Sequence, residues 1–99
     1  MKNLLIAAAV AMSLTVQAEE KQDICGMVNE LAGSIMSARQ RGVDMAQAMS
    51  LASESGAADI IKPIIIAAYE KPRYSVAENQ QLAVTDFKNS VYLVCVKLQ

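Results

Sequence analysis

The two cysteines of this 99-residue chain, Cys25 and Cys95, are its only thiols and its clearest source of covalent chemistry. They lie 70 positions apart, so the chain lacks the Cys-x-x-Cys spacing of a redox-catalytic pair. With only two thiols, an intramolecular bond has one possible pairing; unpaired buried thiols or an intermolecular bridge are the alternatives. We predict a structural Cys25–Cys95 disulfide, whose loop closure would stabilise the fold by about 4 kcal/mol.

The remaining side chains form no pattern that indicates catalysis. The sequence contains no histidine, so the commonest general base and zinc ligand is missing. Its ten acidic residues are spread over expected helix ends and polar faces. Phosphate-binding glycine loops, nucleophile elbows and calcium-loop patterns are absent from the sequence. We therefore expect a protein that is not an enzyme, binds no metal and uses no cofactor.

Residues 1–18 have the composition of a cleaved signal peptide. Lys2 supplies a positive start, residues 4–16 are almost wholly apolar or small, and residues 16–18 suit an export peptidase. The apolar run is shorter than the about 20 residues that span a bilayer, although an uncleaved membrane anchor is the alternative. We predict a periplasmic or secreted protein with no stable membrane insertion after cleavage, in a compartment where disulfides persist. Residues 19–99 would form a single small helical domain.

The charge of the mature chain argues against two classes of partner. After Lys2 is removed, ten acidic and eight basic residues leave a formal net charge of −2. Nucleic-acid binding relies on clustered lysine and arginine side chains that neutralise phosphates. The sequence also has no polybasic tract that would favour a lipid surface. We predict a protein partner in the cell envelope and no nucleic-acid partner; the oligomeric state stays open.

Two segments at the ends of the mature chain have the apolar spacing of amphipathic helices. The first runs from about Gln22 to Gln40, and Gly42 is its expected left-handed stop. The second follows residues 75–78, where Ser75 and Glu78 have the form of a capping box. The disulfide would hold these helices antiparallel, with Cys95 at the edge of the contact. The expected contact joins Ile24, Val28, Leu31 and Ile35 to Val94, Val91, Phe87 and Val84.

The middle of the chain is harder to assign. A short helix is expected from Met45 to about Glu54, after a box-like start at Asp44 and Gln47. Residues 57–69 and 91–96 are rich in strand formers, but we favour helix over strand for both. Pro63 predicts a kink, or a new helix with Pro63 in its first turn. The predicted fold is all-α, a small three- to four-helix bundle stapled by one disulfide.

Several smaller features add to these expectations. Asp59 is a candidate cap for an opening turn near the start of the uncertain middle segment. Gly26 and Gly33 weaken the first predicted helix, so a neighbouring helix is expected to approach closely at those positions.

Three surface features are candidates for binding a partner. One is a set of methionines that would form an adaptable apolar groove or, as the alternative, fill the core: Met27, Met36, Met45 and Met49. The other two are segments of the chain. Between Tyr69 and Tyr74, two tyrosines and Arg73 share one turn, and these residue types are enriched at binding hot spots. Arg39-Gln40-Arg41 is the second segment. The structural alternatives are that Tyr69 packs in the core, that Tyr74 braces a helix cap, and that the arginines answer the dipole of their own helix. The candidate partner-binding residues are Tyr69, Arg73, Tyr74, Arg39 and Arg41.

The function predicted from these observations is a small exported helical protein that acts as a binding or regulatory module on another envelope protein. The overall design is also similar to the small acid-activated periplasmic chaperones, which are exported, short, helical, apolar-rich and built with one disulfide. That resemblance implies a stress- or acid-activated holdase, and the chain departs from it by having cysteines near its ends. Without histidine, such activation would come from carboxylates that protonate below about pH 4–5.

Overall fold

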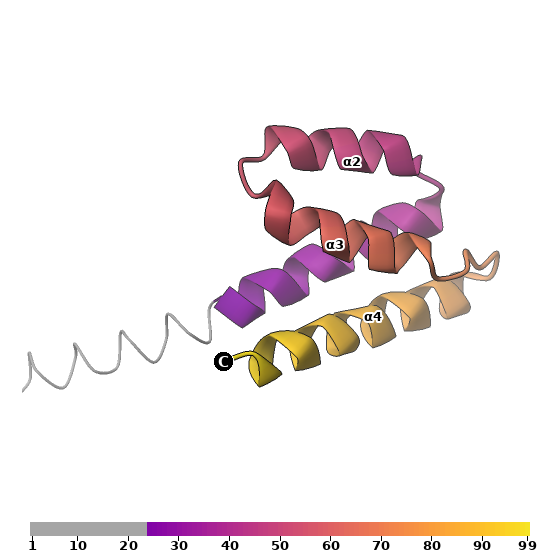
Figure 1. Ribbon diagram of the computed structural model, residues 1–99. Helices are drawn as coiled ribbons and strands as arrows, with labels where there is room; N and C mark the ends of the chain where they lie inside the picture. Colours follow the sequence, from indigo (N-terminus) through magenta and orange to yellow (C-terminus); the bar gives the residue numbers. More distant parts are fainter. Residues whose placement is uncertain (1–23) are drawn as a thin grey trace, which may run out of the picture.

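A computed structural model describes residues 24–99, which form four helices and no strands. A first helix runs through residues 24–41. It is followed by α2 (Met45–Glu54), α3 (Ala58–Tyr69) and α4 (Ala77–Lys97) (Figure 1). The all-α prediction is confirmed for these residues, and both segments that resembled strands are helical. The predicted signal peptide, residues 1–18, lies outside the described residues.

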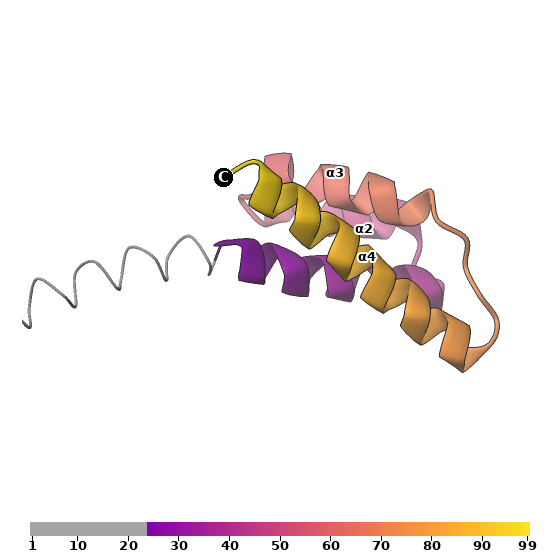
Figure 2. The same ribbon diagram turned by 90° about the horizontal axis from the view of Figure 1, so that it is seen from below.

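The first helix and α4 run in opposite directions, as predicted. Figures 1 and 2 show the C-terminal end of α4 beside the start of the first helix. A disulfide joins Cys25 to Cys95 there, with 5.7 Å between their Cα atoms. α2 and α3 pack against each other as a hairpin, and in Figure 1 α3 lies between α2 and α4. The predicted disulfide therefore links the start of the first helix to the end of the last.

The core is small and is shared by three helices. The first helix, α3 and α4 all contribute to it, and its buried residues are Ala32, Met36, Ile64, Ala68 and Phe87. Val28, Leu31 and Ile35 pack against this cluster from the first helix, and Val84 and Val91 from α4. Most of the predicted contact between the first and last helices is therefore confirmed.

The prediction is wrong at the disulfide end of that contact. Val94 is 56% exposed, and Ile24 is also exposed. Cys95 is half-buried and bonded to the buried Cys25, which agrees with its predicted place at the edge of the stripe. Val94 lies seven residues after Phe87 and therefore on the same side of α4, but the core cluster does not extend to this end of the bundle.

The predicted helix stop at Gly42 is confirmed. Gly42 has φ 86°, the left-handed conformation that glycine adopts without strain. Its N–H donates to the Arg39 carbonyl at 3.1 Å, and the Val43 N–H donates to the Ala38 carbonyl at 3.0 Å. These two bonds form the Schellman motif that ends many helices.

The predicted capping boxes are not formed. Asp44 precedes α2 as expected, but it makes no side-chain capping bond. α4 begins after Val76, one residue later than the Ser75 cap predicts. The side chain of Gln80 instead donates to the Tyr74 carbonyl at 2.6 Å, which ties the start of α4 to the preceding loop. The path of that loop, and not the local cap signature, therefore sets where α4 begins.

α3 is one helix that contains Pro63 in its interior, so of the two alternatives predicted there, a new helix with Pro63 in its first turn is wrong. Asp59 lies in the first turn and is not the cap; that position belongs to Ala57. Proline cannot donate a backbone bond to the Asp59 carbonyl, but both residues are exposed, so water can satisfy it. Burial of Ile65 and Ala68 on the other face supports the helix despite the proline.

One of the two helical glycines marks a close approach. A Cβ atom on Gly33 would lie 2.9 Å from Cδ of Lys88, because the stem of that lysine crosses the first helix there. The lysine Nζ also lies 3.9 Å from a carboxylate oxygen of Glu30. The prediction of close packing is confirmed at Gly33 and wrong at Gly26, where nothing lies within 4 Å of the added atom.

Candidate functional site

A buried glutamine holds the loop between α3 and α4 against the end of the first helix. Gln40 is 2% exposed. Its Nε2 donates to the Pro72 carbonyl at 2.9 Å, and its Oε1 accepts the Tyr74 N–H at 2.8 Å. The same Nε2 lies 3.4 Å from the Met36 sulfur. The amide therefore bonds two backbone groups of a loop more than 30 residues away. These bonds replace those that the amide would make to water, so its burial costs little free energy.

Arg39 and Tyr69 add a second set of contacts at the same place. The Arg39 guanidinium donates from Nε and Nη2 to the Lys71 carbonyl, at 3.2 and 3.1 Å. Its Cζ lies 5.2 Å from the centre of the Tyr69 ring, within the range of a cation–π contact. The Tyr69 hydroxyl donates to the Val43 carbonyl at 2.6 Å. Both predicted residues thus connect the end of α3 to the end of the first helix.

Arg73 completes this arrangement from the loop itself. Its Nε donates to the Gln40 carbonyl at 3.0 Å. Its Nη2 lies 3.0 Å from the position that a Cβ atom on Gly42 would occupy. A cation near a helix C-terminus interacts favourably with the helix dipole. Arg73, from a distant loop, is in that position at the end of the first helix. We refer to Gln40, Arg39, Tyr69 and Arg73, with the backbone of residues 70–74, as the Gln40 clasp.

The structure brings together four of the five predicted binding residues. Tyr69, Arg73 and Arg39 belong to the Gln40 clasp, and the N–H of Tyr74 is bonded to it. Arg41 is exposed and lines a separate groove of about 360 Å³ between the first helix and α4, with residues that include Ser34, Ser37 and Lys88. The two predicted segments are therefore one cluster, from which Arg41 is excluded.

Gln40 lies at the centre of this cluster, although the sequence pattern placed it only between two candidate arginines and gave it no role of its own. The signal that could have found it is its position on the apolar face of the first helix, four residues after Met36 and eight after Ala32. A polar side chain on a buried stripe must find partners, because an unpaired buried amide is costly.

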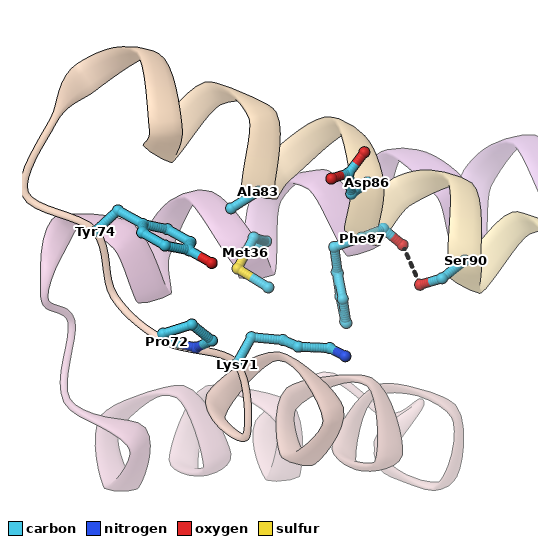
Figure 3. A pocket seen from close by; sticks show the side chains of 8 residues that line it. All are labelled: Met36, Lys71, Pro72, Tyr74, Ala83, Asp86, Phe87 and Ser90. Carbon is cyan, nitrogen blue, oxygen red and sulfur yellow. Dashed lines mark hydrogen bonds between the residues drawn. The ribbon is translucent and has the colours of Figure 1, made fainter.

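The clasp supports one wall of a cavity of about 230 Å³ (Figure 3). The buried side chains of Met36 and Phe87 form its apolar part. The ring of Tyr74, 39% exposed, points from the loop into the cavity toward Met36. We call this cavity the Tyr74 pocket; its lining residues are Met36, Lys71, Pro72, Tyr74, Ala83, Asp86, Phe87 and Ser90.

The rim of the Tyr74 pocket is polar and carries both signs of charge. Lys71 comes from the loop side, and Asp86 and Ser90 come from α4 (Figure 3). The Ser90 hydroxyl donates to the Phe87 carbonyl at 2.9 Å, so its own oxygen stays able to accept a bond. An apolar floor with a few polar groups at the edge is the usual composition of a binding pocket.

The described part of the chain shows no arrangement for metal chemistry. Among residues 24–99, no three His, Cys, Asp or Glu side chains are grouped so that they could hold a metal ion. None of the described helices combines the length and the apolar character that a bilayer crossing requires. The chain matches no protein-family model, no curated protein and no solved structure.

Proposed function

We propose that this protein is an exported, non-catalytic module that binds or regulates another protein of the cell envelope, and that the Tyr74 pocket is its contact surface. The observation that carries this proposal is the Gln40 clasp. It fixes the conformation of residues 70–74 through hydrogen bonds between Gln40 and Pro72, Tyr74 and Arg73. Ordering a loop before binding lowers the entropic cost of the complex. The disulfide fits an oxidising compartment, where such bonds persist.

The lining of the pocket suggests the kind of segment it would accept. Met36 and Phe87 offer a floor for an apolar side chain, and a methionine can adapt its shape to the guest. Lys71 and Asp86 lie on opposite sides of Phe87, with the Asp86 carboxylate turned away from the apolar side chains (Figure 3), and would pair with charges that flank the apolar anchor. Charges at a rim set orientation and association rate more than affinity. The proposed ligand is therefore a protein segment with one apolar anchor between charged residues.

This proposal gives the predicted residues two different roles. Tyr74 would touch the partner directly, since its ring is exposed in the pocket. Arg39, Tyr69 and Arg73 would act by holding the loop, because their polar groups already bond to the protein's own backbone. Replacing those three residues would therefore disturb the loop as well as any contact.

Affinity capture from an envelope extract tests the pocket with two variants that leave the Gln40 clasp intact. Tyr74→Ala removes the exposed ring but keeps the backbone bond to Gln40. Ser90→Arg places a bulky cation on the rim. The matched control is Ser50→Arg, on the exposed face of α2. We expect wild type and Ser50→Arg to enrich the same envelope protein and both pocket variants to lose it, with unchanged circular dichroism. Retention of every partner by both pocket variants contradicts the proposal.

A second candidate function is supported by a different observation. Large apolar side chains are exposed on all four described helices, among them Met27, Leu51, Ile60 and Leu93. Exposed apolar surface is what a holdase uses to bind unfolded clients. Aggregation of a client protein at about pH 3 and about pH 7, values on either side of carboxylate titration, tests this function. A holdase slows aggregation under at least one condition, and absence of protection at both excludes it.

A further inference from the structure

The outward face of α4 carries a stripe that the fold does not use. Its residues follow one another at alternating intervals of three and four, and all are exposed: Leu82, Thr85, Asn89, Tyr92 and Val96. Leu93, also exposed, lies beside Tyr92 and widens the apolar end of the stripe. This spacing is that of the a and d positions of a coiled coil, in which one helix packs along another. We call these five residues the α4 seam.

The α4 seam is separate from the other surfaces of the molecule. The inward face of α4 follows Val84, Phe87 and Val91, which pack on the core, and Cys95, which carries the disulfide. None of the five seam residues lines the Tyr74 pocket or the groove at Arg41. Neither the fold nor the proposed function therefore accounts for the apolar residues of the seam.

We propose that the α4 seam binds the same seam of a second copy of this chain, with the two helices antiparallel. The charges at the ends of α4 give the direction. Glu78 lies in the first turn and Lys97 in the last turn. A parallel pair would place like charges together at both ends, whereas an antiparallel pair places Glu78 of each copy near Lys97 of the other. Opposed helix dipoles favour the same direction.

The composition of the seam is compatible with a two-fold axis near its middle. The antiparallel direction sets Leu82, at one end, against the apolar residues Tyr92 and Val96 at the other end of the second copy. Thr85 and Asn89 then meet near the axis, where an amide can both donate to and accept from its symmetry mate. A single polar residue in such a seam fixes the register of the pair. An interface of this kind is self-complementary, as two-fold symmetry requires.

The dimer leaves the apolar part of the Tyr74 pocket available. Of the pocket residues on α4, Ala83, Phe87 and Ser90 lie on the part of the helix that faces away from the seam, whereas Asp86 on the rim lies beside it. A contact made by one helix from each copy is at the small end of specific interfaces, which bury on the order of 1,000 Å² in total. We therefore expect a dimer that dissociates on dilution.

Sedimentation equilibrium of the oxidised exported protein tests the dimer, at about 1 to about 200 µM, the range in which small interfaces associate. We expect a concentration-dependent dimer in wild type. Val96→Lys should raise the dissociation constant by about tenfold or more, because it places a charge in the seam. Leu82→Lys should do the same, and Leu51→Lys, at an exposed position on α2, should leave the constant unchanged. A monomer throughout this range, or a dimer that neither seam variant weakens, overturns the proposal.

A charge exchange tests the antiparallel direction. Glu78→Lys and Lys97→Glu should each weaken the dimer, by about threefold for exposed ion pairs. The double variant restores both pairs and should return the dissociation constant to the wild-type value. If the double variant dimerises no better than the single variants, the antiparallel direction is wrong. These measurements need no envelope partner, so their outcome is independent of the capture experiment.

Discussion

The two ends of the bundle hold the first helix and α4 together by different means. At one end the Cys25–Cys95 disulfide joins the helices directly. At the other end the connection runs through residues 70–74, which the side chain of Gln40 bonds at two backbone positions. Both ends leave large apolar side chains exposed: Met27 and Leu98 at the disulfide end are 71% and 82% exposed, and Val76 and Leu82 at the clasp end are 55% and 54% exposed. Only the clasp end also buries a polar side chain, Gln40, whose amide is fully paired.

This difference shows what each kind of connection demands of the sequence. A disulfide needs only two cysteines at a suitable distance, so its neighbours are free of tight packing requirements. A buried polar contact needs every donor and acceptor to find a partner, so it constrains the shape of the loop as well. The disulfide end therefore has the stronger connection between the two helices, but it places fewer requirements on the neighbouring residues than the clasp end does. The surface with a defined shape, the Tyr74 pocket, lies at the clasp end.

Breaking the disulfide should produce the largest loss of stability. The Cys25→Ala/Cys95→Ala variant should lower the free energy of unfolding by about 3–5 kcal/mol, because the unfolded chain regains the freedom that a long closed loop removes. Urea denaturation of oxidised wild type and the variant measures the difference. Reduced wild type is the control and should unfold near the same urea concentration as the variant. A loss below about 1 kcal/mol would mean that packing and the clasp alone hold the two helices together.

Removing the central amide of the clasp should come next. Gln40→Ala leaves the Pro72 carbonyl and the Tyr74 N–H without their partner, so we expect a loss of about 2–4 kcal/mol. Gln47→Ala, at an exposed position on α2, is the control and should change stability by no more than about 0.5 kcal/mol. Hydrogen exchange of the Tyr74 amide checks the cause, since it should become fast only in the Gln40 variant. A protected amide in that variant would contradict the role given to Gln40.

The smallest effect is expected at the glycine beneath Arg73. Gly42→Ala forces a left-handed conformation on alanine and crowds the Arg73 guanidinium, for a loss of about 1–2 kcal/mol. Gly26→Ala, where the added methyl group meets nothing, should instead gain up to about 1 kcal/mol from helix propensity. Thermal unfolding of the two variants should therefore shift in opposite directions. Equal shifts in the unfolding temperature would contradict the claim that Gly42 needs a left-handed conformation and Gly26 does not.

The helices and the disulfide were predictable because both depend on local patterns or simple counting. Apolar spacing identified the helix of residues 24–41 and α4, and two cysteines allow one intramolecular pair. The length of the buried stripe on α4 was harder to predict, since Val94 continues the apolar spacing of Phe87 and Val91 and is nevertheless exposed. Where the core ends depends on tertiary packing, which apolar spacing within one helix does not show.

The candidate site was predictable in its residue types and not in its geometry. Tyrosine and arginine content marked residues 69–74 and 39–41, and the structure brings most of those residues together. No local pattern indicates that Gln40 bonds a loop 32 to 34 positions later in the chain. The same long-range contacts explain the shifted start of α4, because the loop enters the helix already held at Tyr74. The spacing of residues within one segment does not show which distant segment they will contact.

Site-specific photo-crosslinking in intact cells tests the central claim that the Tyr74 pocket is the contact surface. A photoreactive side chain at Ser90, on the pocket rim, is compared with one at Ser50 on α2. We predict that the Ser90 probe forms an adduct with a different envelope protein, identified by mass, and that the Ser50 probe does not form it. Absence of any such adduct from Ser90, or the same adduct from both positions, would contradict this account.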